Sequence, residues 1–341
     1  MDSLLAGLVG ALLATNQPAA VSNVIYQRTG EAIPLVSAND PVEREFREVM
    51  IKDDKAQQEV DRWIVENNKF AEAGAGVPKR ELNARIMKRF ESVRQAYEDF
   101  LKRHPDNARA HLAFASFLDD INDQEESKNQ MEKARELNPG DPAVWNNLAN
   151  YYGHYGAVTQ AFAYYNEAIR LNPNEPIYYQ NFGTTVFLFR KDAREFYIIN
   201  EQQVFDKALE LYSQARKLAP DDFELATDVA QTYYGIRPWR FDDALGAWTN
   251  ALNVAQNQVQ REGVYIHLAR ISIQAGRWAQ VTQLLNSVTN PAFTQLRDRV
   301  AKSVEFWKTN QAAGETNWFY LRSNTPAAQP TNTDKAGGAK P

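Results

Sequence analysis

Amide and hydroxyl side chains gather in two stretches of this 341-residue chain, WNNLAN (145–150) and YQNFGT (179–184). An amide offers a hydrogen-bond donor and an acceptor together, so it can pair with a peptide unit at two points. The two stretches lie 34 residues apart. The residues that could supply these contacts are Asn146, Asn147, Asn150, Gln180, Asn181 and Thr184.

No arrangement of residues indicates catalysis or a metal site. The chain has no G-x-x-x-x-G-K-[ST], H-E-x-x-H or G-x-S-x-G motif. It has no cysteine, which excludes disulfides, thiolate metal ligands and a cysteine nucleophile. Its four histidines, His104, His111, His154 and His267, lack a recurring i, i+4 partner that would suit a metal. We therefore expect a protein that is not an enzyme and that uses no metal, cofactor or small-molecule substrate.

The charges of the chain exclude one class of partner. Lysine and arginine together number 38 and aspartate and glutamate 43, which gives a net charge of −5, and the two signs are interspersed. Binding to nucleic acid needs a basic face or stripe. The sequence therefore predicts a protein or peptide partner and no nucleic acid.

The elements that must position the amides repeat with a fixed period. Pro105, Pro139 and Pro173 close similar phrases at intervals of 34 residues, and Pro220 follows after 47. A period of 34 is typical of helix–turn–helix units that stack into a solenoid. The prolines then mark where the second helix of each unit ends.

Residues 142–173 carry the most complete pattern and resemble a tetratricopeptide repeat. Small residues at two positions let the paired helices approach closely, and aromatic residues fill the space between them. In the preceding unit His111 takes the position of the tryptophan, where a packing role is expected. The matching residues are Trp145, Leu148, Ala149, Tyr152, Ala161, Tyr165, Ala168 and Pro173.

This resemblance implies an all-α, right-handed helical-repeat solenoid of about five helix pairs with helical caps at both ends. Before the array we expect an apolar segment (1–20), a linker (21–40) and an N-terminal helical cap (41–107). After it we expect a C-terminal capping helix (292–322) and a disordered tail (323–341). The array itself spans 108–291, as repeats 108–141, 142–175, 176–222, 223–258 and 262–291.

The resemblance also implies where a ligand would lie, because the first helix of each unit lines a concave groove in this family. Asn147 and Asn181 resemble the asparagine ladder by which some family members hold a peptide backbone. The lysines and arginine of the dicarboxylate clamp are absent, which disfavours recognition of a C-terminal carboxylate. The alternative is a solvated polar face without a ligand. The same register adds Asp228, Gln231, His267 and Arg270 to the groove candidates.

Repeat 176–222 carries an insertion of 13 residues between its helices, around 190–202. We expect it either to extend the first helix without a ligand role or to fold over the groove. A long loop costs little, since each doubling of length adds about 0.6 kcal/mol. Its candidate contact residues are Arg190, Phe196 and Tyr197.

Residues 4–14, LLAGLVGALLA, are too short to span a bilayer but suit the apolar core of a secretory signal. Asp2 stands where a signal carries a basic residue. Either a basic region precedes Met1, or the segment is the apolar N-terminus of a cytoplasmic protein. Export is the preferred expectation, to the periplasm or envelope, and membrane contact is expected through this segment alone.

Two functions fit these features. One is a non-catalytic scaffold that binds an extended polypeptide in its groove. The other is a structural subunit of a bacterial envelope complex that uses its cap helices or convex face. The layout resembles uncharacterised exported tetratricopeptide proteins of environmental bacteria.

Overall fold

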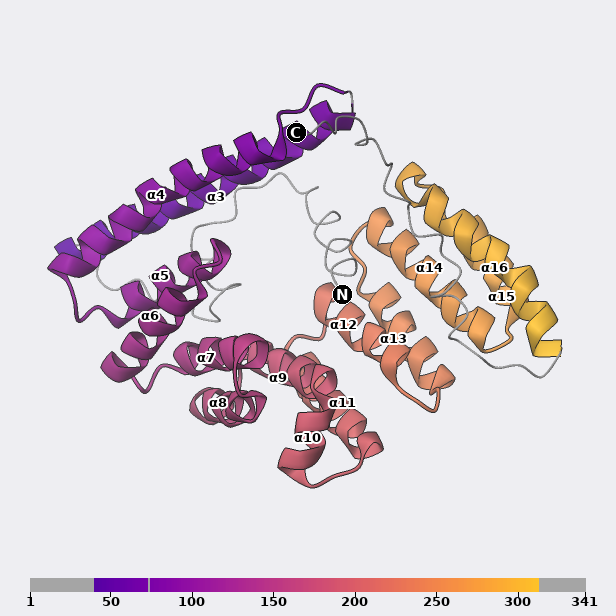
Figure 1. Cartoon of the computed structure of the whole chain (residues 1–341). Helices are drawn as coiled ribbons and strands as arrows, with labels where there is room; N and C mark the ends of the chain where they lie inside the picture. The colour runs from indigo at the N-terminus through magenta and orange to yellow at the C-terminus, as the bar shows by residue number, and fades with distance from the viewer. Residues whose placement is uncertain (1–39, 73, 313–341) are drawn as a thin grey trace, which may run out of the picture. The chain divides into compact units, whose positions relative to one another are not determined.

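The computed structural model describes residues 40–72 and 74–312, and the regular structure in these ranges is helical (Figure 1). This confirms the expected all-α helical-repeat fold. The described residues form two compact units, and the boundary in the chain falls between Asp221 and Asp222. The predicted apolar segment and tail lie outside the described residues.

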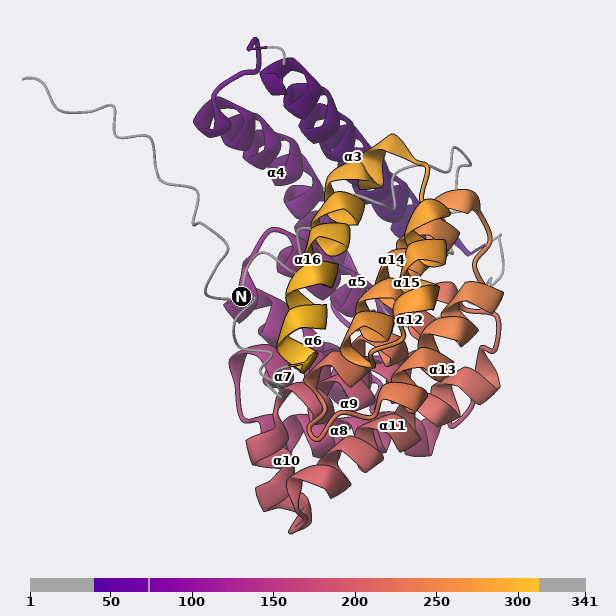
Figure 2. The same ribbon diagram turned by 90° about the vertical axis from the view of Figure 1, so that its right-hand side faces the viewer.

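Unit 1 consists of helical hairpins in chain order. α3 pairs with α4, α5 with α6, and α7 with α8, while α9 pairs with α11 across the short helix α10. Figure 2 shows α3 and α4 as a hairpin of long helices. The bounds are α3 (Pro41–Glu72), α4 (Lys79–Arg103), α5 (Ala108–Asp120), α6 (Gln124–Leu137), α7 (Pro142–Tyr155), α8 (Val158–Leu171), α9 (Pro176–Leu188), α10 (Arg190–Tyr197) and α11 (Glu201–Leu218).

The 34-residue spacing of prolines corresponds to a hydrogen bond that recurs in three hairpins of unit 1. Trp145 Nε1 donates to the carbonyl of Pro139 at 2.8 Å, six residues earlier. The hydroxyl of Tyr179 donates to the carbonyl of Pro173 at 3.1 Å, and His111 Nε2 to that of Pro105 at 2.9 Å. The fourth residue of each first helix thus fixes the turn before it. His111 replaces tryptophan without loss of this donor.

Caps and small residues determine how these helices start and how closely they pack. Asp141 accepts a hydrogen bond from the amide of Ala143 at 2.9 Å, which satisfies a free amide at the start of α7. Between α9 and α11 the close approach requires Gly183. A Cβ at this position would lie 3.2 Å from the carbonyl oxygen of Ala208 and 3.3 Å from the ring of Tyr212.

Unit 2 has two helical hairpins and a final helix. α12 (Phe223–Thr232) pairs with α13 (Phe241–Asn253), and α14 (Gln258–Gln274) with α15 (Trp278–Asn286). α16 (Thr294–Ala312) packs on α14 and α15. Short 3₁₀ turns, η1 (Tyr233–Gly235) and η2 (Pro291–Phe293), follow α12 and precede α16. α14 starts four residues before the predicted repeat because Asn257 caps it, accepting from the amide of Gln260 at 2.9 Å.

Candidate functional site

The first helices α7 and α9 are joined by a chain of amide hydrogen bonds. Asn181 Nδ2 donates to Asn146 Oδ1 at 3.1 Å, and Asn146 Nδ2 donates to Asn147 Oδ1 at 3.3 Å. Asn146 is 1% exposed and Asn147 8% exposed. The sequence register predicts that both line an open groove, and this is wrong for Asn146, which packs between the helices. Burial is possible because each buried amide finds a polar partner.

Two more groove candidates support buried tyrosines of the second helices. The Tyr165 hydroxyl donates to Asn150 Oδ1 at 2.6 Å and lies 3.0 Å from Thr185 Oγ1. The Tyr212 hydroxyl lies 2.8 Å from Thr184 Oγ1. Burial raises the pKa of Tyr165, so its hydroxyl stays protonated and available as a donor. Part of the polar capacity of this face is therefore used to hold the hairpins together.

Some hydrogen-bonding atoms of this face have no partner among the described residues. They are Nδ2 of Asn147, Nδ2 of Asn150 and Oδ1 of Asn181. Asn150 and Asn181 are partly exposed, as are Gln180 and Thr184. α7 and α9 therefore present two amide donors and one acceptor, and we name this set the amide face (Asn147, Asn150 and Asn181).

In unit 2 the predicted groove residues of α14 form a cluster with aromatic rings. The His267 ring stacks on Trp248, with 4.1 Å between centroids and 7° between planes. Its Nδ1 lies 3.0 Å from the Tyr234 hydroxyl. The Arg270 guanidinium lies over the Tyr234 ring, 5.0 Å from its centroid. Asp228 and Gln231 are half-buried on α12.

The insertion does not fold over the first helices. It forms α10, whose Phe196 and Tyr197 rings lie 5.4 and 5.8 Å from Phe162 on the second helix α8. Arg190 donates to the carbonyl of Phe187 at 3.0 Å and lies 3.5 Å from the Glu201 carboxylate. These residues therefore anchor a helix whose apolar side packs on α8, and the groove-covering alternative is wrong.

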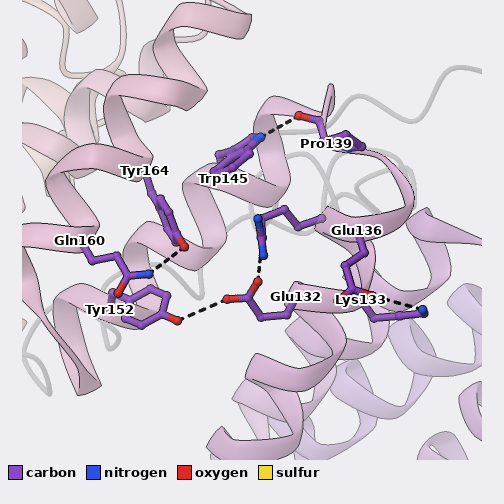
Figure 3. Close-up of polar contacts among 9 residues, drawn as sticks. Glu132, Lys133, Glu136, Pro139, Trp145, Tyr152, Gln160 and Tyr164 are labelled. Atoms are coloured by element: carbon purple, nitrogen blue, oxygen red, sulfur yellow. Dashed lines mark hydrogen bonds and ion pairs between the residues drawn. The ribbon is translucent and has the colours of Figure 1, made fainter.

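A partly exposed cluster of polar and aromatic side chains lies where α6, α7 and α8 meet, and the sequence did not single it out as a surface feature (Figure 3). Trp145 and Tyr164 pack edge to face with centroids 5.2 Å apart. The Tyr152 hydroxyl donates to Glu132 at 3.3 Å, and Arg135 donates to the same carboxylate at 2.7 Å (Figure 3). Repeat periodicity predicted Trp145 and Tyr152 as packing residues but gave no signal for these charged partners.

Comparison with known protein families identifies the repeats. A model described as "TmcB, TPR repeats" matches residues 80–141, and a model described as "Tetratricopeptide repeat" matches residues 118–176. Residues 80–176 of this chain therefore carry tetratricopeptide repeats. The first match includes α4, which the sequence assigned to the N-terminal cap. No curated protein matches the sequence of the chain.

Solved tetratricopeptide structures show distant similarity. PilF of Pseudomonas aeruginosa is 17% identical with a TM-score of 0.46, covering 76% of this chain and 99% of that one. YrrB, titled "a TPR protein with an unusual peptide-binding site", is 14% identical with a TM-score of 0.44, covering 61% and 99%. MamA is 20% identical with a TM-score of 0.40, covering 52% and 95%. At these values no function is transferred from them.

No helix within 40–72 and 74–312 has the length and apolarity needed to cross a membrane. No group of three or more histidine, aspartate or glutamate residues in the same ranges could hold a metal ion.

The cluster around His267 should make the stability of unit 2 depend on pH. Burial and then the charge of Arg270 lower the pKa of His267 from 6.5 to about 3. Below about pH 6.5 His267 is therefore protonated in the unfolded chain but stays neutral in the folded chain. The free energy of unfolding then decreases as pH falls toward 3, by up to about 1.4 kcal/mol per pH unit. Denaturant unfolding from pH 7 to 4 should show this loss. His267→Phe keeps a ring on Trp248 and should lack it; an unchanged pH profile in this variant would contradict the assignment.

Proposed function

We propose that this chain is a non-catalytic scaffold that binds an extended polypeptide along the first helices of its middle repeats. The amide face is the observation that carries the proposal. Its two donors and one acceptor lie on neighbouring helices and are unpaired within the described chain. A peptide backbone offers complementary carbonyl and amide groups along its whole length.

Hydrogen bonds to the amide face contribute too little free energy to hold a peptide by themselves. A hydrogen bond contributes about 0.5–1.5 kcal/mol net, whereas micromolar affinity needs about 8 kcal/mol. Apolar side chains of the partner must supply the remainder. Partly exposed rings on the same two helices, those of Tyr151 on α7 and Phe187 on α9, are candidates to receive them.

Changing the amide face should weaken peptide binding. Asn150→Asp keeps the acceptor that holds Tyr165 and replaces only the unpaired amide donor. Combined with Asn181→Ala, it should reduce affinity for peptides selected from a random display library by about tenfold, since each decade corresponds to about 1.4 kcal/mol. Asn174→Asp, in the exposed turn before α9, makes the same charge change away from the face and serves as the matched control.

Binding would be measured by titration calorimetry, and melting temperatures would confirm that the variants fold. If no peptide is enriched, or if the double variant binds as tightly as the control, the groove-binding function is wrong.

One observation favours a second candidate function, an assembly subunit of an envelope complex. The α3–α4 hairpin exposes large apolar side chains, with Phe70 on α3 59% and Met87 on α4 54% exposed. Exposed large apolar side chains are a feature of interaction surfaces. The apolar composition of residues 4–14 supports export of the chain.

Phe70→Ser with Met87→Gln should abolish a complex that depends on this hairpin. Sedimentation of extracts from cells that express the chain would measure its mass, and cell fractionation would show whether it is exported. Leu218→Ser removes an exposed apolar side chain of α11 and is the matched control. An assembly of unchanged mass in the double variant would exclude the hairpin, and a cytoplasmic chain would exclude the envelope.

A further inference from the structure

Arg270 is a partly buried cation that has no anionic partner among the described residues. Its guanidinium contacts the face of Tyr234, and no aspartate or glutamate of the described residues pairs with it. Most partly buried arginines in this chain do have such a partner, for example Arg109 with Glu43 at 3.0 Å and Arg89 with Glu59 at 2.8 Å. Removing a charge from water without pairing it is costly. The site is therefore more favourable when an anion occupies it.

The surroundings of Arg270 are fixed in position. Tyr234 lies under the guanidinium and also contacts His267, which in turn stacks on the buried Trp248. Tyr234 has no other hydrogen-bond acceptor among the described residues, so we assign its hydroxyl as the donor to His267 Nδ1. The imidazole proton then resides on Nε2, which no other group in residues 40–72 and 74–312 pairs with. A guanidinium on an aromatic face and a neutral N–H donor thus belong to one rigid cluster.

The charge of Arg270 affects the pKa values of Tyr234 and His267, which supports the view that no nearby acid neutralises this charge. Burial raises the pKa of Tyr234 to about 12, and the arginine charge opposes this rise. Burial and the same charge lower the pKa of His267. No carboxylate is among the causes of either shift.

We propose that Arg270, Tyr234 and His267 form a binding site in unit 2, the Arg270 site, for one carboxylate of an acidic side chain of a polypeptide partner. This inference rests on the proposed scaffold function and names a chemical group that the partner must carry. The guanidinium fork pairs with both oxygens of a carboxylate. The neutral imidazole adds a donor without adding charge.

The single cation of the site argues for a singly charged ligand. A phosphate group carries about −1.5 to −2 charges at neutral pH and is better matched by several cations. A chain terminus differs from an acidic side chain only in how the carboxylate is attached, so the test must separate these two sources.

The experiment follows the Arg270 side-chain Nε–Hε signal of the full, ¹⁵N-labelled chain by NMR. Four probes are titrated: N-acetylglutamate N-methylamide, its glutamine isostere, N-acetylglycine and inorganic phosphate. We expect a saturable shift with the glutamate probe at millimolar concentration and none with the glutamine probe. N-acetylglycine should bind more weakly than the glutamate probe, and phosphate should produce no tighter binding.

Variants connect the shift to the site. Arg270→Lys keeps the charge and loses the fork, and Arg270→Gln loses both, so affinity read from the His267 signals should fall in that order, by about tenfold for Arg270→Gln, equivalent to 1.4 kcal/mol. Tyr234→Phe keeps the ring under the guanidinium and removes the bond to His267, so it should bind the glutamate probe within about threefold of wild type, a difference below 1 kcal/mol.

Three results would overturn the proposal: equal shifts with the glutamate and glutamine probes, tighter binding of N-acetylglycine or phosphate than of the glutamate probe, or unchanged affinity in Arg270→Gln. Failure here is distinguishable from failure of the scaffold function. Peptides selected on the amide face could still bind and lose affinity in the Asn150→Asp, Asn181→Ala variant while ignoring Arg270.

Discussion

Trp248→Ala should unfold unit 2 at temperatures where the wild-type chain is folded. Trp248 is 1% exposed and packs against two rings, that of Tyr234 at a centroid distance of 6.2 Å and that of His267 at 4.1 Å. Truncation of a buried aromatic residue to alanine costs about 3–5 kcal/mol, because contacts are lost and a cavity remains. A domain is stable by only about 5–15 kcal/mol, so this loss is a large part of the total.

Hydrogen exchange measured by mass spectrometry would test this, because it reports each helix separately. Protection should fall in α12–α15, while unit 1 keeps its protection. Trp248→Phe is the informative control. The buried Trp248 Nε1 has no hydrogen-bond partner among the described residues, so phenylalanine removes an unsatisfied donor and should cost far less than alanine. Equal protection in wild type and Trp248→Ala would show that unit 2 does not depend on this ring.

The fold followed from the sequence because the packing positions repeat. The 34-residue spacing of Pro105, Pro139 and Pro173 predicted the hairpins, and the structure shows a hydrogen bond to each of their carbonyls. The donors are His111, Trp145 and Tyr179, three different residue types that share one register position. Periodicity therefore identifies where a residue packs, even when its identity changes.

The candidate site was harder to predict from the sequence than the fold. The repeat register indicates in which direction a side chain points but not whether it is buried. Asn146 and Asn181 stand at groove positions, yet one is buried and bonded to the other. Whether an amide meets solvent depends on how closely α7 and α9 approach, which is set by neighbouring side chains distant in sequence. For Arg270 the register predicted a groove position, but only the structure shows that no acid of the described residues pairs with its guanidinium.

The insertion illustrates the same limit. The interrupted 34-residue period predicted the length of the insertion. The position of α10 depends on the packing of Phe196 and Tyr197 against the ring of Phe162 on α8. Apolar burial drives such packing and is not directional. A single sequence therefore shows that the insertion contains aromatic side chains, but it does not show against which helix they pack.

Glu262→Ala should destabilise unit 2 by about 3 kcal/mol, because it removes a buried carboxylate that holds the loop before α16, and the donors left behind lose their partner. Glu262 is 1% exposed. One of its oxygens accepts from the amides of Thr289 at 2.8 Å and Asn290 at 2.7 Å. The other accepts from the Thr289 hydroxyl at 3.0 Å and from Gln258 at 2.9 Å.

The pH dependence of this effect has a defined sign. Burial alone raises the pKa of Glu262, but hydrogen bonds from Asn290, Gln258 and Thr289 outweigh it, so the pKa lies below its ordinary value of 4.5. The stabilisation is therefore complete above pH 4.5 and is lost as pH falls through the lower, folded-state pKa. Urea unfolding of wild type and Glu262→Ala at pH 7 and at pH 3 should show a smaller difference at the lower pH. Glu262→Gln keeps the shape but loses one acceptor, so it should fall between the two. A difference that grows on acidification would mean that the carboxylate is not held in its charged form, and that the loop is positioned by packing alone.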